Sequence, residues 1–188
     1  MGDQFRVYPL PCTQNAQSMI QVTAPAKIIL LGEHAVVYGQ PAIAIPVLRL
    51  RAVATTHKTV PGSGLQIVAS DLGSSIKIAT VTGEALSDNP IHVIAGKVLN
   101  ILGIQPPDLT ITVQSDIPVA SGLGSGAAIS TVIARALASA PGTPLENSII
   151  NDLVYQVEKL HHGTPSGIDN TVIVYERPVY FVRGHDVD

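Results

Sequence analysis

The sequence contains very little cysteine, few aromatic residues and few charges. Its 188 residues include one cysteine, Cys12, and no tryptophan. A single cysteine excludes an internal disulfide framework and fits a reducing compartment. Aromatic residues make up 4% of the chain, so valine, isoleucine, leucine and alanine have to fill the core. The hydrophobic share of 46% is sufficient for such a core.

The formal net charge of −3 provides no basic surface for nucleic acid or an anionic membrane. No apolar run approaches the roughly 18 residues of a membrane-spanning helix. Residues 1–18 mix Asp3, Arg6, prolines and amides, and they lack the apolar centre of a secretory signal peptide. We therefore expect a cytoplasmic globular protein with a loosely ordered leader over 1–18, and no nucleic-acid or membrane partner.

Apolar segments separated by Gly, Pro and Ser predict strands over residues 19–23, 27–31, 42–47, 48–57, 65–69, 76–81 and 108–114. The first two are expected to flank an Ala-Pro-Ala turn, and 65–69 and 76–81 to follow 48–57 as antiparallel neighbours. Helical spacing predicts helices over 90–102, 127–140 and 145–160, the last with Glu146 in its first turn. Residues 171–175 and 179–182 resemble a hairpin. This order predicts an α+β lobe.

Residues 117–128, IPVASGLGSGAA, form a glycine-rich turn that leads into an alanine-rich helix. Gly122, Gly124 and Gly126 allow the backbone to approach a bulky group without an intervening Cβ. The amides of such a turn, together with the positive end of the helix dipole, are suited to binding phosphate.

Three interpretations of this turn compete. No Gly-Lys-Ser/Thr follows, which excludes a P-loop. Gly122, Gly124 and Ala127 fit the loose dinucleotide pattern, with Glu146 about 20 residues on. In that motif, however, the strand leads directly into the first glycine, whereas residues 115–121, including Pro118, intervene here. A helix entry that binds nothing is the third alternative. Phosphate binding is favoured.

A second segment, residues 24–39, brackets an aliphatic strand with charged residues. Lys27 precedes four aliphatic residues, and Glu33 and His34 follow Gly32. A lysine at the mouth of a buried strand can lower the pKa of a substrate hydroxyl, and a Glu-His pair can hydrogen-bond polar substrate groups. The alternative is a strand flanked by solvated charges.

The third segment extends from Glu158 to Asn170. Glu158 lies near a helix C-terminus, where the dipole disfavours a carboxylate, so its position calls for a reason. The loop that follows can bring Asp169 back beside it. Two carboxylates near a phosphate loop suit a magnesium–nucleotide site, one holding the cation and one orienting the acceptor hydroxyl. The alternative is a helix-terminal ion pair with Lys159 or a histidine. Zinc at His161-His162 is disfavoured, because adjacent histidines diverge.

Together, APAKIILLGEHAVVYGQPAIA at 24–44, IPVASGLGSGAA at 117–128 and HGTPSGIDN at 162–170 resemble the mevalonate kinases of the galactokinase, homoserine kinase, mevalonate kinase and phosphomevalonate kinase (GHMP) superfamily. The resemblance implies ATP and Mg²⁺ as cofactors and mevalonate as substrate, and it leaves a homodimer open. Another small-alcohol kinase of the superfamily, acting on phosphomevalonate or homoserine, and a non-catalytic truncated lobe are the alternatives.

The resemblance also implies roles for individual residues. Asp169 would accept or orient the proton of the acceptor hydroxyl, and Lys27 would lower the pKa of that hydroxyl. Glu33 and His34 would contact mevalonate, as would Lys27 and Asp169. Glu158 would bind magnesium. The residues expected at the ATP phosphates are Ser115, Ala120, Ser121, Gly122, Leu123, Gly124, Ser125 and Gly126.

The sequence departs from the family at two points. Where members commonly carry a second serine that helps hold magnesium, this chain has Gly126, so that Ser125 or water would have to substitute. The family also continues into a C-terminal lobe with another glycine-rich motif. We therefore expect residues 19–170 to form the N-terminal, ATP-binding domain and residues 171–188 to begin a C-terminal lobe that is largely missing.

Overall fold

A computed structural model describes residues 19–69, 74–78 and 89–183 of the chain. The elements in this part are β1 (Gln21–Leu31), the short helix η1 (Ala35–Tyr38), β2 (Ala42–Lys58), β3 (Leu65–Ala69), β4 (Ser74–Ile78), α1 (Pro90–Leu102), β5 (Leu109–Ser115), α2 (Ser125–Ser139), α3 (Asn147–His162), α4 (Ile168–Tyr175) and β6 (Val179–Phe181). The expected leader over 1–18 lies outside the described residues, as do positions 79–81 of the expected strand 76–81.

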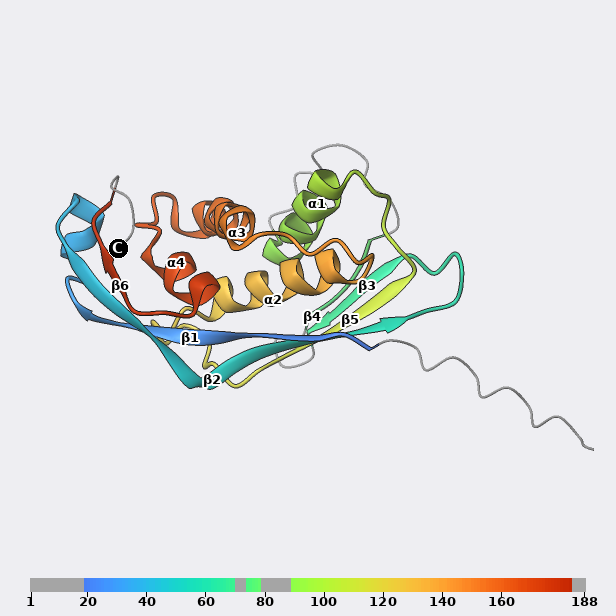
Figure 1. Ribbon diagram of the computed structural model, residues 1–188, viewed down its shortest axis with the longest axis horizontal. Helices are drawn as coiled ribbons and strands as arrows, with labels where there is room; N and C mark the ends of the chain where they lie inside the picture. The colour runs from blue at the N-terminus through green and yellow to red at the C-terminus, as the bar shows by residue number, and fades with distance from the viewer. Residues whose placement is uncertain (1–18, 70–73, 79–88, 184–188) are drawn as a thin grey trace, which may run out of the picture.

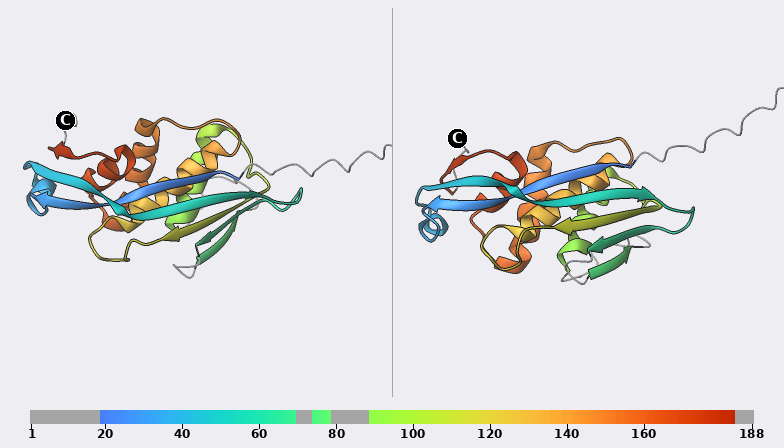
Figure 2. Two further views of the ribbon diagram at one scale, coloured as in Figure 1. Left: turned by 60° about the horizontal axis from the view of Figure 1, so that its bottom comes forward. Right: turned by 90° about the horizontal axis from the view of Figure 1, so that it is seen from below.

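The strands form one mixed sheet in the order β1-β2-β5-β3-β4, and β6 pairs with the first residues of β2. The helices lie together on one face of this sheet (Figure 1). Seen from below, the strands lie in front of the helices (Figure 2). This two-layer arrangement confirms the expected α+β lobe.

Helix α2 lies at the centre of the core because small residues allow it to approach the sheet closely. The sheet presents alanines to it, with Ala24, Ala26, Ala52 and Ala54 all 0% exposed. The helix packs on β1, β2 and β5 and is buried along most of its length, from Ala127 to Ala138. Alanine on both surfaces brings backbone close to backbone, so that the N-terminus of α2 is held rigidly relative to β1.

The expected Ala-Pro-Ala turn is wrong, because residues 21–31 form one continuous strand. Pro25 is accommodated because β1 lies at the edge of the sheet, where a missing N–H removes no necessary ladder bond. The register against β2 shifts between Pro25 and Ala26, which absorbs the irregularity. Residues 42–47 and 48–57 likewise merge into the single long strand β2.

The expected pairing of residues 65–69 with 48–57 is also wrong. β5 lies between them and pairs antiparallel with β2 and parallel with β3. The chain passes from β3 through β4 and helix α1 before β5 returns beside β3, which is the helical crossover that a parallel pair requires. The antiparallel pairing of β3 with β4 is confirmed.

The expected hairpin at 171–175 and 179–182 is wrong, since residues 168–175 form helix α4 and β6 pairs with β2 instead. The run Thr171-Val-Ile-Val174 is β-branched and buried throughout, so its composition favours a strand. It is buried because α4 lies between two apolar clusters. Val172 packs in a small core with Val36 and Phe181, while Ile173 packs in the main core.

The helix boundaries follow local signals. The bounds of α1 agree with the prediction, with the Asn89 Oδ1 accepting a hydrogen bond from the Ile91 amide at 3.0 Å and Gly103 left-handed at the C-cap. α2 begins at Ser125, two residues earlier than expected. α3 begins at Asn147, which places Glu146 at the N-cap rather than in the first turn. The expected domain boundary at 170/171 falls within α4.

Candidate active site

The loop between β5 and α2 has a backbone that depends on glycine. Gly122 has φ 75° and Gly124 has φ 76°, both in the left-handed region. A Cβ on Gly124 would lie 2.6 Å from Ile173 Cδ1 and 3.1 Å from Lys27 Cγ, whereas a Cβ on Gly122 would meet nothing within 4 Å. The left-handed backbone conformation therefore favours glycine at both positions. At position 124, close packing against Ile173 and Lys27 also leaves no room for a side chain.

The N-terminus of α2 is open to a ligand. Gly124 is its N-cap residue, and no side chain caps this end. The first amides of a helix lack intrahelical partners, and the dipole adds partial positive charge there. The loop in front is held in place, because the Ser121 hydroxyl donates to the Pro118 carbonyl at 2.7 Å and the Lys27 amide donates to the Leu123 carbonyl at 3.0 Å. The arrangement is suited to an anion.

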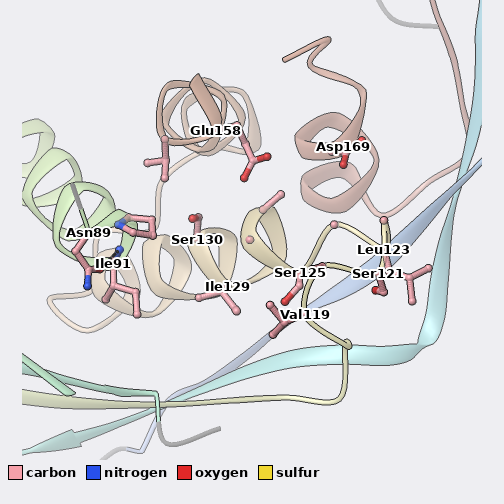
Figure 3. Close-up of a pocket in the computed structure, with 17 residues that line it drawn as sticks. Asn89, Ile91, Val119, Ser121, Leu123, Ser125, Ile129, Ser130, Glu158 and Asp169 are labelled. Atoms are coloured by element: carbon pink, nitrogen blue, oxygen red, sulfur yellow. Dashed lines mark hydrogen bonds between the residues drawn. The ribbon is translucent and has the colours of Figure 1, made fainter. Parts of the chain in front are cut away.

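A pocket of about 450 Å³ opens at this N-terminus. Its walls come from the glycine-rich loop, α2, the beginning of α1, α3 and the first turn of α4 (Figure 3). The lining residues are Asn89, Pro90, Ile91, Val119, Ala120, Ser121, Gly122, Leu123, Gly124, Ser125, Gly126, Ala127, Ile129, Ser130, Val157, Glu158 and Asp169. The structure thus brings the expected loop residues 120–126 together with both expected carboxylates.

Lys27 and Asp169 form an ion pair beside the loop. Lys27 Nζ lies 2.8 Å from Asp169 Oδ1, and the lysine is 4% exposed. The stem of Lys27 packs beneath Gly124, and Asp169 lines the pocket from the first turn of α4, where the helix dipole favours a carboxylate. A buried ammonium needs an opposite charge, which Asp169 supplies. The solvated-charge alternative is therefore wrong for Lys27.

Glu158 reaches the pocket from α3 and is 9% exposed (Figure 3). Its Oε1 lies 3.3 Å from the position that a Cβ on Gly126 would occupy. Gly126 is in the first turn of α2, so this carboxylate lies directly beside the proposed phosphate-binding end of the helix. A side chain at position 126 would contact Glu158 itself.

The potential metal ligands in this pocket suit Mg²⁺ better than they suit a metal that is coordinated only by protein side chains. Among the described residues, no cluster of three or more His, Cys, Asp or Glu side chains occurs. Mg²⁺ commonly takes one or two carboxylates and completes its shell with phosphate oxygens and water. Glu158 supplies one such carboxylate, and the Ser125 hydroxyl belongs to the lining of the same pocket. The side chains of His161 and His162 lie outside the description.

Four expected site residues are absent from the lining of this pocket: Lys27, which reaches it only through its ion pair with Asp169, and Ser115, Glu33 and His34. Ser115 lies at the end of β5, where its hydroxyl accepts a hydrogen bond from the Ile117 amide at 3.2 Å. Glu33 and His34 are exposed between β1 and η1. They follow the end of β1, whose stretch from Lys27 to Leu31 alone covers about 13 Å of backbone. Their contact with a substrate stays a prediction.

Sequence reasoning missed the part of the pocket away from the loop. Its walls are Asn89, Pro90 and Ile91 from α1, Ile129 and Ser130 from α2 and Val157 from α3. The Asn-Pro start of α1 was recognisable as a helix cap, but nothing in the sequence placed it opposite α2. Four of these six residues are apolar, so this end of the pocket is suited to an apolar group.

A second charged cluster ties the far end of α4 to the sheet. The Glu176 carboxylate accepts hydrogen bonds from Arg51 at 2.7 Å and from Arg135 at 2.8 Å. Arg135 also donates to the Thr23 and Val174 carbonyls, at 2.7 Å each. Burial raises the pKa of the Glu176 carboxyl, but hydrogen bonds from the two arginines and their charges outweigh it and hold this pKa below the ordinary 4.5. α4 is thus fixed at both ends, with Asp169 at the pocket.

Comparison with known proteins agrees with this geometry. Residues 89–177 match the family described as the GHMP kinases N terminal domain. The chain is 32% identical over 175 residues to the mevalonate kinase of Pyrococcus horikoshii, covering 88% of this chain and 52% of that protein. It is also 32% identical over 194 residues to the mevalonate kinase of Schizosaccharomyces pombe, with 80% and 48% covered.

Among solved structures, the crystal structure of the Methanococcus jannaschii mevalonate kinase superimposes with a TM-score of 0.80 at 26% identity, covering 93% of this chain and 56% of that one. The chain belongs to the GHMP kinase family and contains its N-terminal domain. The family members just compared are all mevalonate kinases, and the chain spans about half of their length. In the described part, no helix is long and apolar enough to cross a membrane.

Proposed function

We propose that this chain provides the phosphate-binding and acceptor-activating part of an ATP- and Mg²⁺-dependent kinase that phosphorylates the primary hydroxyl of (R)-mevalonate to give 5-phosphomevalonate. The observation that carries the proposal is the Lys27–Asp169 pair, with its 2.8 Å contact, beside the glycine-rich loop. One pocket holds Asp169, that loop and Glu158. An acceptor group and a phosphate cradle in one pocket are what phosphoryl transfer requires.

The glycine-rich loop binds the phosphates in this proposal. The uncapped amides at the start of α2 donate to phosphate oxygens, and the left-handed Gly122 and Gly124 expose the backbone to them. Glu158 and Ser125 would hold the magnesium ion, which would supply positive charge against the phosphoryl oxygens. The Leu123 carbonyl of the loop accepts a hydrogen bond from the Lys27 amide. This bond fixes the position of the phosphate-binding loop relative to the Lys27–Asp169 pair.

Asp169 acts at the acceptor. Its carboxylate accepts the hydroxyl proton, or orients that hydroxyl, as the hydroxyl oxygen bonds to the γ-phosphorus of ATP and the bond from that phosphorus to the departing ADP oxygen breaks. Lys27 holds Asp169 in place and lowers the pKa of the hydroxyl by its positive charge. The lining residues include no histidine or cysteine to serve as a phosphoryl-accepting nucleophile, and Asp169 is assigned to the acceptor hydroxyl. We therefore propose direct, in-line transfer.

The choice of mevalonate is supported by the names of the relatives and by the sequence strings GEHAVVYG and HGTPSGIDN. A coupled ADP-release assay tests it with a panel of (R)-mevalonate, phosphomevalonate and homoserine. The assay is run on the 188-residue chain and on the natural gene product that contains it. We expect the highest kcat/KM with mevalonate. Faster turnover of another alcohol would overturn the substrate, and no ATP-dependent transfer by either protein would overturn the kinase assignment.

A further inference from the structure

Ser130 is a buried polar residue in the pocket that has no role in the site described above. It lies on α2, one helical turn after Gly126, and its relative exposure is 3%. Figure 3 shows its hydroxyl on the side of α2 that faces α3, within the pocket. Serine in the interior of a helix ordinarily faces solvent or bonds to a carbonyl one turn back.

The neighbouring threonine shows the contrast. The Thr131 hydroxyl donates to the Ala127 carbonyl at 2.7 Å and is thereby satisfied within the helix. The Ser130 hydroxyl makes no hydrogen bond to another described residue. Every fully enclosed side-chain oxygen in the described part of the chain has a hydrogen-bond partner, so the Ser130 oxygen is not fully enclosed. The Ser130 oxygen therefore opens to the pocket, where a group of a bound molecule can satisfy it.

The position of Ser130 along the pocket indicates which group that is. In Figure 3 it lies between Ser125 and Glu158 on one side and Asn89 and Ile91 on the other. The first side is the phosphate end of the pocket, and the second is its mainly apolar end. A nucleotide carries phosphate, ribose and base in this same order, so the ribose would lie over Ser130.

We propose that the Ser130 hydroxyl hydrogen-bonds a ribose hydroxyl of the nucleotide bound in this pocket, an assignment that rests on the proposed function. The Ser130 hydroxyl would hold the ribose in position, and the apolar side chains at that end of the pocket would contact the base. Ser130 is thus a binding residue for the nucleoside, separate from the phosphate cradle and from the Lys27–Asp169 pair.

Isothermal titration calorimetry of the 188-residue chain with Mg²⁺ tests this proposal. The ligands are ATP, 2′-deoxy-ATP, 3′-deoxy-ATP and inorganic tripolyphosphate. The variants are Ser130→Ala and, as a matched control, Ser139→Ala at the far end of the same helix. Alanine is the best helix former, so both variants should fold, and thermal unfolding followed by circular dichroism verifies this.

Loss of one hydrogen bond predicts an ATP affinity about threefold to tenfold weaker in Ser130→Ala and unchanged in Ser139→Ala. Tripolyphosphate affinity should be unchanged in both variants, and one of the two deoxy nucleotides should bind the wild type and Ser130→Ala equally. Unchanged ATP affinity in Ser130→Ala would overturn the inference alone. So would an equal loss for tripolyphosphate, or a loss that persists with both deoxy nucleotides. A wild-type chain that binds neither ATP nor tripolyphosphate would refute the proposed function, and this inference with it.

Discussion

The Lys27 ammonium and the Asp169 carboxylate, far apart in the sequence, meet at 2.8 Å where β1 passes beneath the first turn of α4. The lysine is almost fully buried, while the side chain of Asp169 retains 33% exposure and faces the pocket. The pair therefore presents the carboxylate to the pocket, with its charge partner behind it. This polarity underlies the first prediction.

Asp169→Asn should lower kcat at least about a hundredfold, because the amide cannot take a proton from the acceptor hydroxyl. Nucleotide affinity should stay within about twofold of wild type, since the phosphate cradle is unchanged. Steady-state kinetics and calorimetry measure the two quantities. Asp152→Asn, an exposed position on α3, is the control. A kcat near that of the control would show that Asp169 takes no part in proton transfer.

Glu158→Gln should raise the magnesium concentration needed for tight nucleotide binding, because a neutral amide is a weaker ligand for a hard cation than a carboxylate. Binding of nucleotide without magnesium should change little. Magnesium titrations at fixed nucleotide, followed by calorimetry, give the midpoint. Glu146→Gln, exposed before the same helix, is the matched control. If Asp169→Asn and Glu158→Gln shifted the midpoint alike, the roles given to the two carboxylates would be wrong.

Gly126→Ser should tighten the apparent magnesium affinity. The added Cβ would lie 3.3 Å from Glu158 Oε1, so the new hydroxyl adds an oxygen beside the one carboxylate assigned to the cation. We expect a tightening of about threefold, the effect of one modest additional interaction. The same magnesium titration measures it.

Gly126→Ala separates the hydroxyl from the space it occupies. It adds the same Cβ near Glu158 without an oxygen, so its magnesium affinity should be equal to or weaker than that of the wild type. If serine and alanine behaved alike, Ser125 or water would already complete the site, or the contact with Glu158 would leave no room for a side chain.

Glu176→Gln should lower the free energy of unfolding by about 1–2 kcal/mol at neutral pH, an estimate reduced for the partial exposure of the Arg51 and Arg135 pairs. The pKa of Glu176 is lower in the folded state than the ordinary 4.5. Its stabilisation is therefore fully present above the unfolded pKa and is lost as pH falls through the folded value.

Urea denaturation from pH 7 to pH 3 measures this dependence. The difference in unfolding free energy between wild type and Glu176→Gln should be constant above about pH 5.5 and shrink below about pH 4.5. Glu146→Gln, an exposed carboxylate replaced in the same way, is the control. A difference that grew toward low pH would contradict the assigned direction of the Glu176 pKa shift.

The sequence was sufficient wherever the signal is local. The Asn89-Pro90 start and the Gly103 end of α1 were predicted because capping residues mark helix ends directly. The glycine-rich loop was recognised from its glycines, and Glu158 and Asp169 were expected side by side because Glu158 stands near a helix C-terminus and a short loop leads back to Asp169; the pocket contains all three.

The parts that could not be predicted depend on long-range packing. Helix α4 was mistaken for a strand because all residues from Thr171 to Val174 are β-branched, and only the position of the helix between two cores explains why they are all buried. The parallel pairing of β3 with β5 depends on the α1 crossover rather than on either strand. Ser130 and Thr131 look alike in the sequence, but only Ser130 faces the pocket.

The most direct test of the central claim, that this pocket binds the phosphates and nucleoside of a nucleotide, is an NMR titration of the ¹⁵N-labelled chain with MgATP. The largest amide shifts are expected at Ala120 to Gly126, with further shifts at Ser130 and Asp169. The absence of shifts at saturating nucleotide, or shifts concentrated away from the residues that line the pocket, would contradict it.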